Sequence, residues 1–313
     1  MAAPAPPRKD TTFREYTASA ARGYASARLS YPPELYSFIL SRHAETGGQF
    51  GTLVDVGCGP GNATRDLAPA FDHARGIDAG AGMIAAAAQL GGGARDGEIA
   101  WKVAGAEEMA DAEKTGLEEG SVDLLAAATS AHWFDMPAFW RQAAKLVRPG
   151  GSVAIFARSS SYCHPENPRA GELRRIFTEF EESELSPYRV SGSGLTHEFY
   201  SALQLPWDDA DPDGGPPAFP RDAFERHLWN VDGALDGAGG TDFFGGSLTL
   251  TFPQMEKMLG TMGLVMRWRA AHPGAEGTDG DIVKVVLRRI KEVAETEELK
   301  MGTGFALLFF KRK

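Results

Sequence analysis

The chain has 313 residues, of which 43% are apolar and 24% charged, an ordinary globular composition that excludes disorder, collagen or coiled coil throughout. Its net charge of −10 argues against a nucleic-acid partner and against binding to anionic lipids. The first residues lack the apolar centre of a signal peptide, and no segment reaches the roughly 18 apolar residues of a membrane span. We therefore expect a cytoplasmic protein without a membrane partner.

The N-terminal part is expected to contain a tail and a lid. Residues 1–12 are rich in Pro and Ala and predict a disordered tail. Residues 13–46 predict helical segments that fold over a ligand site. Within them, Pro33–Arg42 has the apolar spacing of an amphipathic helix.

Residues 47–158 alternate between short apolar strands and helices, which predicts a ligand-binding core. The expected strands are Thr52–Val56, His73–Ile77, Ile99–Val103, Val122–Ala128 and Ser152–Ala157. The expected helices follow the first strand up to about Phe71 and cover Met83–Leu90 and Pro137–Val147. Such an alternation is typical of a parallel sheet with helices on both faces.

The pattern is less regular beyond residue 158. Residues 159–246 predict a variable cap that holds a substrate, and residues 247–313 are expected to complete the sheet. The expected helices here are Gly171–Glu184, Pro253–Trp268 and Asp281–Ala294, and the expected strands are Phe224–Val231 and Gly304–Lys311. The glycine-rich stretch Gly233–Gly246 predicts a loop.

A glycine-rich turn, Gly57-Cys58-Gly59-Pro60-Gly61, joins the first strand to the next helix. Glycines let the backbone turn sharply and let a ligand come close to it. Asn62 stands where the dinucleotide-binding fingerprint has its third glycine, and the turn has no phosphate-binding lysine. The turn therefore predicts a site for a ligand other than a pyrophosphate.

Two acids accompany this turn. Asp78 ends the second strand, 19 residues after Gly59, where a carboxylate can accept hydrogen bonds from ribose hydroxyls. Asp55 lies inside the first strand, where a buried acid is costly unless something pairs with it, as a cationic ligand would.

Taken together, these features resemble the class I S-adenosylmethionine-dependent methyltransferases. Ala106-Glu107 resembles their adenine-facing turn, and Leu146–Gly151 resembles the motif before their fifth strand. The resemblance implies S-adenosylmethionine as cofactor and a Rossmann-like α/β fold. That fold has a seven-stranded, mostly parallel sheet with an antiparallel last strand, an N-terminal lid and an inserted cap. The implied cofactor-binding residues are Asp55, Gly57, Cys58, Gly59, Gly61, Asp78, Ala79, Met83, Ala106, Glu107 and Ser130.

A narrower resemblance is to the fungal trans-aconitate methyltransferase family. It is carried by Tyr24, Arg28 and Tyr31-Pro32, by Ala131–Asp135, by Ser186–Tyr188 and by the segment Leu248–Trp268. It implies O-methylation of a small carboxylic acid. The expected substrate-binding residues are Tyr24, Arg28, His132, Trp133, Tyr188 and Arg189, with His132 and Tyr24 as the candidate catalytic residues.

One departure from that family concerns charge. Family members that act on polyacids carry arginines after the Pro-Tyr segment, where this chain has Ser191–Leu195 and only Arg189 nearby. Each substrate carboxylate needs a charged partner, so we expect a mono-acid or a mostly apolar metabolite instead of a tri-acid.

Alternatives remain for the acceptor and for His132. The acceptor could instead be a phenol, an amine or a carbon of a natural product, and the chain could bind the cofactor without transferring methyl. His132 could act as a base, donate a hydrogen bond, or be a core imidazole. We expect no metal ion, no nucleic acid, a small-molecule acceptor, and a monomer or homodimer.

Overall fold

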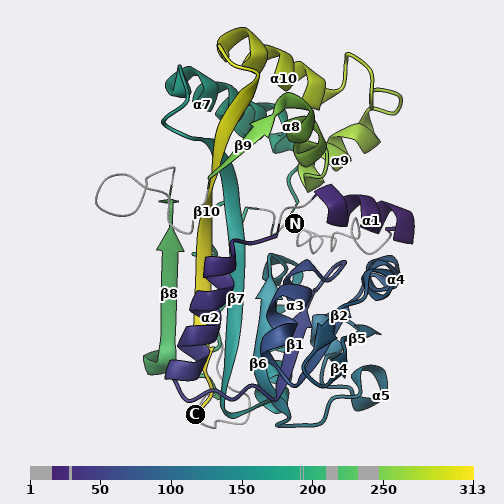
Figure 1. The fold of residues 1–313 in the computed structure, drawn as a ribbon, viewed down its shortest axis with the longest axis vertical. Helices are drawn as coiled ribbons and strands as arrows, with labels where there is room; N and C mark the ends of the chain where they lie inside the picture. Colours follow the sequence, from purple (N-terminus) through teal and green to yellow (C-terminus); the bar gives the residue numbers. More distant parts are fainter. Residues whose placement is uncertain (1–15, 28–29, 191, 193, 209–217, 232–246) are drawn as a thin grey trace, which may run out of the picture.

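The computed structural model describes residues 16–27, 30–190, 192, 194–208, 218–231 and 247–313 (Figure 1). The predicted tail at 1–12 and the loop Gly233–Gly246 lie outside the described residues. Within the described part, no helix has both the length and the apolar character needed to cross a lipid bilayer.

The centre of the molecule is a mixed sheet in the order β5-β2-β1-β6-β7-β10-β8, with β9 paired to the first part of β10. Neighbours from β5 to β7 pair in parallel, whereas β10 is antiparallel to β7, β8 and β9. The strands are β1 (Thr52–Val56), β2 (His73–Asp78), β5 (Ala100–Val103), β6 (Val122–Ala128), β7 (Val147–Cys163), β8 (Phe224–Trp229), β9 (Ser247–Thr251) and β10 (Glu298–Lys311). A separate short hairpin joins β3 (Gly93–Ala94) to β4 (Gly97–Glu98).

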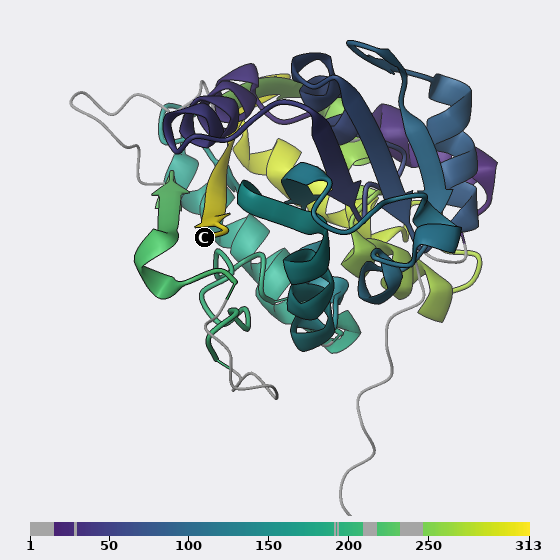
Figure 2. The ribbon, with the colours of Figure 1, turned by 90° about the horizontal axis from the view of Figure 1, so that it is seen from below.

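The predicted Rossmann-like, mostly parallel sheet is confirmed. The predicted strand number was wrong, because β9 adds an eighth strand among the described residues. Both faces of the sheet carry apolar side chains, so helices cover both (Figure 2). Leu35 and Ile39 of α2 (Pro33–Glu45) pack on one face with α3 (Asn62–Leu67). Phe139 and Trp140 of α6 (Met136–Leu146) pack on the other. The short helix α5 (Ala112–Thr115) precedes β6.

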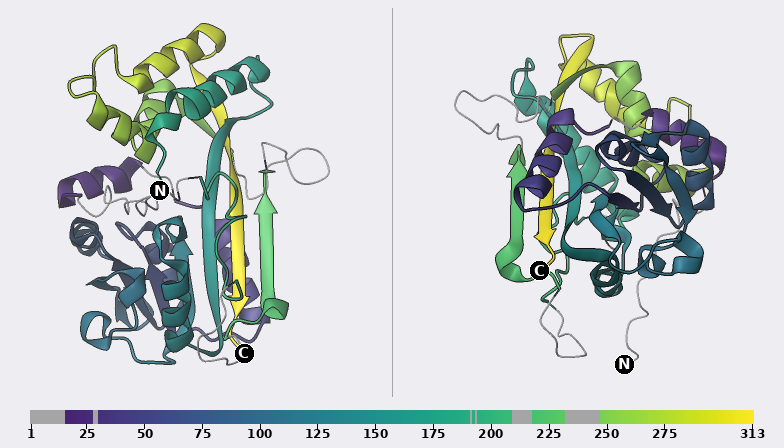
Figure 3. Two further views of the ribbon diagram at one scale, coloured as in Figure 1. Left: turned by 180° about the vertical axis from the view of Figure 1, so that it is seen from behind. Right: turned by 60° about the horizontal axis from the view of Figure 1, so that its bottom comes forward.

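A helical cap lies beyond the carboxyl edge of the parallel strands (Figures 1 and 3). It consists of α7 (Ala170–Glu179), α8 (Phe252–Leu259), α9 (Gly263–Ala271) and α10 (Ile282–Val293). Buried side chains such as Phe177, Met255 and Val286 give the cap its own apolar core. β7 and β10 run from the sheet into this core, where Cys163 and Met301 pair.

The division of the chain therefore differs from the predicted one. β8 lies within residues 159–246 yet belongs to the sheet, and α8–α10 lie within residues 247–313 yet belong to the cap. The single helix predicted at Pro253–Trp268 was also wrong, because Gly260 ends α8 and a second helix begins at Gly263.

The N-terminal helix α1 (Ala18–Ala27) lies between the sheet and the cap. Ala21 packs against Met83 of α4 (Ala81–Leu90), and the Tyr16 hydroxyl donates to the sulfur of Met266 in α9 at 2.7 Å. Contacts on both sides place α1 where a lid over the carboxyl edge of the sheet would lie.

An ion pair at the opposite edge of the sheet ties three strand starts together. Asp123 at the start of β6 is 1% exposed. One of its carboxylate oxygens accepts from the backbone N–H of Thr52 at 2.7 Å, and the other lies 2.8 Å from Nε of Arg148. The carboxylate thereby connects β1, β6 and β7.

Arg148→Ala should lower the free energy of unfolding by about 1–3 kcal/mol, because it removes a charged partner from a buried carboxylate. Denaturant unfolding of the variant, with the exposed Arg141→Ala as control, measures this. Equal stabilities of the two variants would show that the pair contributes nothing.

Candidate active site

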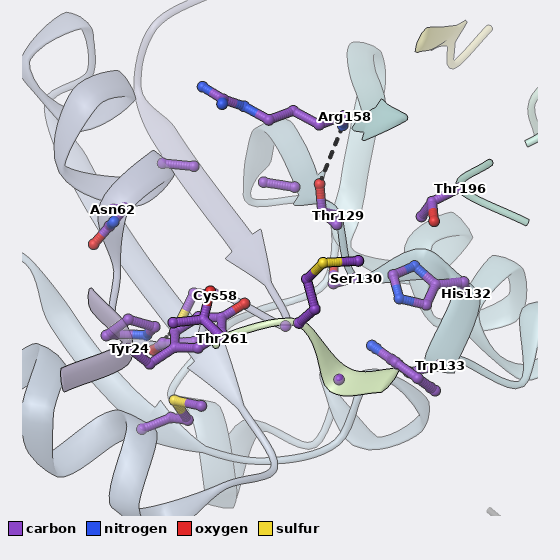
Figure 4. Close-up of a pocket in the computed structure, with 18 of the residues that line it drawn as sticks. Tyr24, Cys58, Asn62, Thr129, Ser130, His132, Trp133, Arg158, Thr196 and Thr261 are labelled. Carbon is purple, nitrogen blue, oxygen red and sulfur yellow. Dashed lines mark hydrogen bonds between the residues drawn. The ribbon is translucent and has the colours of Figure 1, made fainter. Parts of the chain in front are cut away.

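A cavity of about 390 Å³ lies between the carboxyl edge of the sheet, α1 and the cap. The ends of β1, β2, β6 and β7 contribute residues to it, as expected for ligand sites of open α/β sheets. Figure 4 shows Tyr24 and Cys58 on one side of this cavity and His132 and Trp133 on the other. The segments that follow β1 and β6 and the helix α1 therefore line the same cavity.

The turn after β1 forms the floor of the cavity. Gly57 has φ +67°, and a Cβ there would lie 2.5 Å from Cβ of Ser130, so only glycine fits. The Ser130 hydroxyl donates to the carbonyl of Val56 at 2.9 Å, which fixes the end of β6 against the end of β1. Gly59 also has a positive φ and has open space where a side chain would be, so a ligand can approach its backbone.

Asp78 organises two turns at once. Its carboxylate accepts from the backbone N–H of Gly59 at 2.8 Å and from that of Gly80 at 2.7 Å. Each oxygen has further acceptor capacity, and Asp78 lines the cavity. The geometry suits an acid that receives a pair of hydroxyl groups.

Asp55 is placed differently from the prediction. It is fully buried beneath the turn, it is not among the residues that line the cavity, and it accepts from the Thr64 hydroxyl at 2.6 Å. Burial raises the pKa of Asp55 to about 7, and the nearby Asp78 adds to the rise. Asp55 thus lies behind the turn and does not line the cavity.

The two thiols are buried and not bridged. Burial raises the pKa of Cys58 well above its ordinary value, and burial raises that of Cys163 to about 11. Both are therefore neutral thiols at pH 7, and neither has the character of a nucleophile.

The turns after β5 and β2 line the same end of the cavity. Ala106 and Glu107 follow β5, whereas Ala79 and Met83 follow β2. Glu107 accepts from the backbone N–H of Asp135 at 2.9 Å, so the turn after β5 is tied to the start of α6. These residues surround the apolar slot next to the Gly-rich turn.

Two predicted substrate residues, Tyr188 and Arg189, do not line the cavity of the described structure. Arg189 pairs with Glu182 at 2.5 Å, and Tyr188 lies against His272, with ring centroids 6.0 Å apart. Arg28 lies outside the described residues. Among the predicted cofactor residues, Gly61 begins α3 beside Trp101 and does not line the cavity either.

The structure adds residues that the sequence motifs did not indicate. Thr129 has φ 46°, a strained value for a β-branched residue, and strain of this kind is concentrated at functional sites. Its hydroxyl is hydrogen-bonded to that of Tyr31 and accepts from the backbone N–H of Arg158 at 3.4 Å (Figure 4). Both Thr129 and Tyr31 line the cavity.

The cap end of the cavity carries charged and polar side chains. Arg158 of β7 donates to the carbonyl of Ser30 and lies over the ring of Tyr31, whereas Arg267 of α9 donates to the carbonyl of Tyr188 at 2.7 Å. Glu181 and His197 lie 3.8 Å apart on the same wall. Arg158 and Arg267 therefore both line the cavity.

Comparisons with known proteins agree with this geometry. Residues 54–155 match the family model described as a methyltransferase domain. A Dictyostelium discoideum protein assigned as a methyltransferase is 34% identical over 148 residues, 47% of this chain and 50% of that protein. The Saccharomyces cerevisiae protein CRG1 is 30% identical over 144 residues, which are 46% of this chain and 45% of that protein. CRG1 is assigned as an S-adenosylmethionine-dependent methyltransferase.

A solved structure from Anaeromyxobacter dehalogenans, described as a type II methyltransferase, has a similar fold. Its TM-score is 0.61 at 20% identity, covering 91% of this chain and 97% of that one. Residues 54–155 therefore carry a methyltransferase domain. The chain spans about half the length of the curated relatives it matches. The narrower resemblance to the trans-aconitate family stays a prediction for this methyltransferase domain.

Asp78→Ala should weaken S-adenosylmethionine binding by about 1–3 kcal/mol, the range for hydrogen bonds to a charged group. Asp78→Asn should also weaken binding, because its amide NH2 cannot accept and would face the backbone N–H of Gly59 or of Gly80. Isothermal calorimetry on both variants measures this, with NAD as the ligand expected not to bind. Unchanged affinity in Asp78→Ala, accompanied by a large fall in melting temperature, would reassign Asp78 to a purely structural role.

Asp55 should make stability depend on pH. Because the folded state raises its pKa to about 7, the folded protein holds a proton that the unfolded chain releases near pH 4. Its contribution is therefore present at low pH and lost as pH rises from about 4 to about 7, by at most about 1.4 kcal/mol per pH unit. Asp55→Asn should flatten this slope in denaturant unfolding at several pH values, and parallel slopes would contradict the assignment.

Proposed function

We propose that this protein transfers a methyl group from S-adenosylmethionine to a small, mostly apolar molecule that carries one carboxylate. The observation that carries the proposal is the cavity, which joins the glycine-rich turn and Asp78 to a largely apolar cap wall that holds Arg158, Arg267 and Glu181. When bound, the cofactor would supply a methyl group on a sulfonium: an oxygen–carbon bond to the acceptor would form as the carbon–sulfur bond breaks, and the sulfur would leave as a neutral thioether.

The floor of the cavity fits this cofactor. The carboxylate of Asp78 would accept from the ribose hydroxyls, in line with its place at the end of β2. The slot formed by Ala79, Met83, Ala106 and Glu107 would hold the adenine ring. The open backbone at Gly59 would admit the remaining part of the cofactor.

The chain's own residues would position the reactants and exclude water. α1 packs on α4 and brings Tyr24 to the cavity, and Tyr16 just before it bonds to Met266 of α9, so this N-terminal segment would cover the site. Positioning of two reactants can supply roughly 7–11 kcal/mol of the barrier. A carboxylate acceptor is ionised at pH 7, so no general base would be required.

The cap wall favours an apolar acceptor with one anionic group. Its apolar lining residues are Phe177, Met258, Leu259, Met262, Leu264 and Met301. Arg158 and Arg267 bring two positive charges to the cavity, and Glu181 opposes them with one negative charge. One substrate carboxylate would neutralise the positive charge that remains. A substrate with three carboxylates would leave some of them without a charged partner, at a cost of several kcal/mol for each.

Purified protein incubated with methyl-labelled cofactor and a metabolite extract should yield a labelled small molecule. A methyl ester is released by mild alkali, whereas an ether or a methylated amine is stable to it. In steady-state kinetics, apolar mono-acids should have kcat/KM values at least about tenfold above that of trans-aconitate, the factor that corresponds to 1.4 kcal/mol.

Arg267→Gln and Arg158→Gln identify the cation that holds the carboxylate, since the relevant variant should raise KM for acids and leave cofactor affinity unchanged. Arg189→Gln is the matched control, because Arg189 pairs with Glu182 away from the cavity. Efficient turnover of trans-aconitate alone would overturn the proposed acceptor class, and alkali-stable products would favour a hydroxyl or amine acceptor.

A further inference from the structure

His132 is contacted from behind by a buried tyrosine. His132 belongs to the short turn Ala131–Trp133 after β6 and lines the cavity next to Trp133, with ring centroids 4.4 Å apart. Its Nδ1 lies 3.0 Å from the hydroxyl oxygen of Tyr200. Tyr200 is fully buried and is not among the cavity-lining residues, so its hydroxyl reaches the edge of the imidazole that faces the core.

The direction of this hydrogen bond follows from what surrounds the phenol. Burial raises the pKa of Tyr200 well above its ordinary value. The phenol therefore keeps its proton at pH 7, and among the described residues the hydrogen bond with Nδ1 of His132 is the one that its hydroxyl makes. A buried O–H needs an acceptor, and Nδ1 of His132 supplies one. An Nδ1–H group would instead use the phenol oxygen as its acceptor and leave the buried O–H proton without one.

The backbone that carries Tyr200 is held in an unfavourable conformation. Phe199 and Tyr200 have φ values of 52° and 58°, in the left-handed region that bulky residues rarely adopt. Arg226 of β8 donates to the carbonyl of Phe199 at 3.1 Å and to that of Tyr200 at 3.3 Å. Gly304 of β10 leaves room for the Phe199 ring, because a Cβ there would lie 2.7 Å from two ring carbons. Two strands of the sheet thus fix the place of the Tyr200 side chain.

We propose that Tyr200 is a positioning residue that holds His132 with its proton on Nε2, so that His132 donates a hydrogen bond toward the cavity and does not act as a base. An imidazole of this tautomer has no lone pair on Nε2 to receive a proton. To act as a base there, the ring would have to lose the hydrogen bond from Tyr200. The role toward an acceptor oxygen rests on the proposed function, whereas the tautomer does not.

The tautomer is tested directly on the cofactor-free protein at pH 7.5. With histidine labelled at both ring nitrogens, the seven His residues are resolved by nitrogen–proton correlation NMR and His132 is assigned with His132→Gln. We expect a protonated Nε2 and an unprotonated, hydrogen-bonded Nδ1 in the wild type. A protonated Nδ1 would overturn the proposal without any variant being needed.

Tyr200→Phe should then give His132 a mixture of tautomers. The matched control is Tyr36→Phe, which also removes a buried tyrosine hydroxyl, one bonded to Ser30 and not to His132. It should leave the His132 signals unchanged. Unchanged His132 signals in a folded Tyr200→Phe protein would overturn the proposal.

A kinetic measurement separates this proposal from the proposed function. Tyr200→Phe should lower kcat/KM for the acceptor about tenfold, the loss that corresponds to one hydrogen bond of roughly 1.4 kcal/mol, with cofactor affinity within twofold of wild type. The expected tautomer without methyl transfer to any acid would reject the proposed function alone. An active wild type with Nδ1 protonated would reject the role of Tyr200 alone.

Discussion

The antiparallel pairing of β7 with β10 is the constraint on which the site depends. The two strands pair from Ser152 and Lys311 in the sheet to Cys163 and Met301 in the cap. Because both strands continue past the ends of β1, β2 and β6, the cap they carry is suspended over the carboxyl edge of those strands. The cavity occupies the space between, so the length of this strand pair sets the distance between cofactor floor and acceptor wall.

The pairing is interrupted at the level of the cavity. The register of β10 against β7 shifts between Thr303 and Phe305, and Ser161 and Thr303 line the cavity beside this bulge. β-bulges re-aim side chains and are frequent next to active sites. Gly304, inside the bulge, is also the residue that makes room for Phe199. One irregularity therefore shapes the cavity wall and supports the segment that carries Tyr200.

The floor of the site could be predicted from the sequence because its determinants are close together along the chain. A strand, a glycine turn and a helix fall within residues 52–67, and Asp78 ends the strand that pairs with β1. A parallel sheet brings consecutive strand ends to one edge, so the position of Asp78 follows from the order of elements alone.

The acceptor wall could not be predicted in the same way. The single helix expected at Pro253–Trp268 is divided at Gly260 into α8 and α9. Arg267 belongs to the second of these helices, and it lines the cavity. Tyr200 reaches His132 across 68 positions of sequence, through a left-handed backbone that no residue pattern indicates. Arg189 was predicted to line the acceptor wall because it follows the segment Ser186–Tyr188. In the structure it forms an ion pair with Glu182 and does not line the cavity.

The charged groups around the proposed acceptor together limit which class of acceptor can be methylated. A hydroxyl or amine acceptor has to lose a proton during methylation, so it requires a base at the reacting atom. If Tyr200 keeps His132 protonated on Nε2, the imidazole cannot take that proton, and the donor it presents would instead hold an oxygen that is already negative. A carboxylate is such an oxygen at pH 7, and Arg158 and Arg267 provide cations to balance it. The proposed orientation of the Tyr200 hydroxyl and the number of cationic side chains would thus both favour the carboxylate acceptor that we propose.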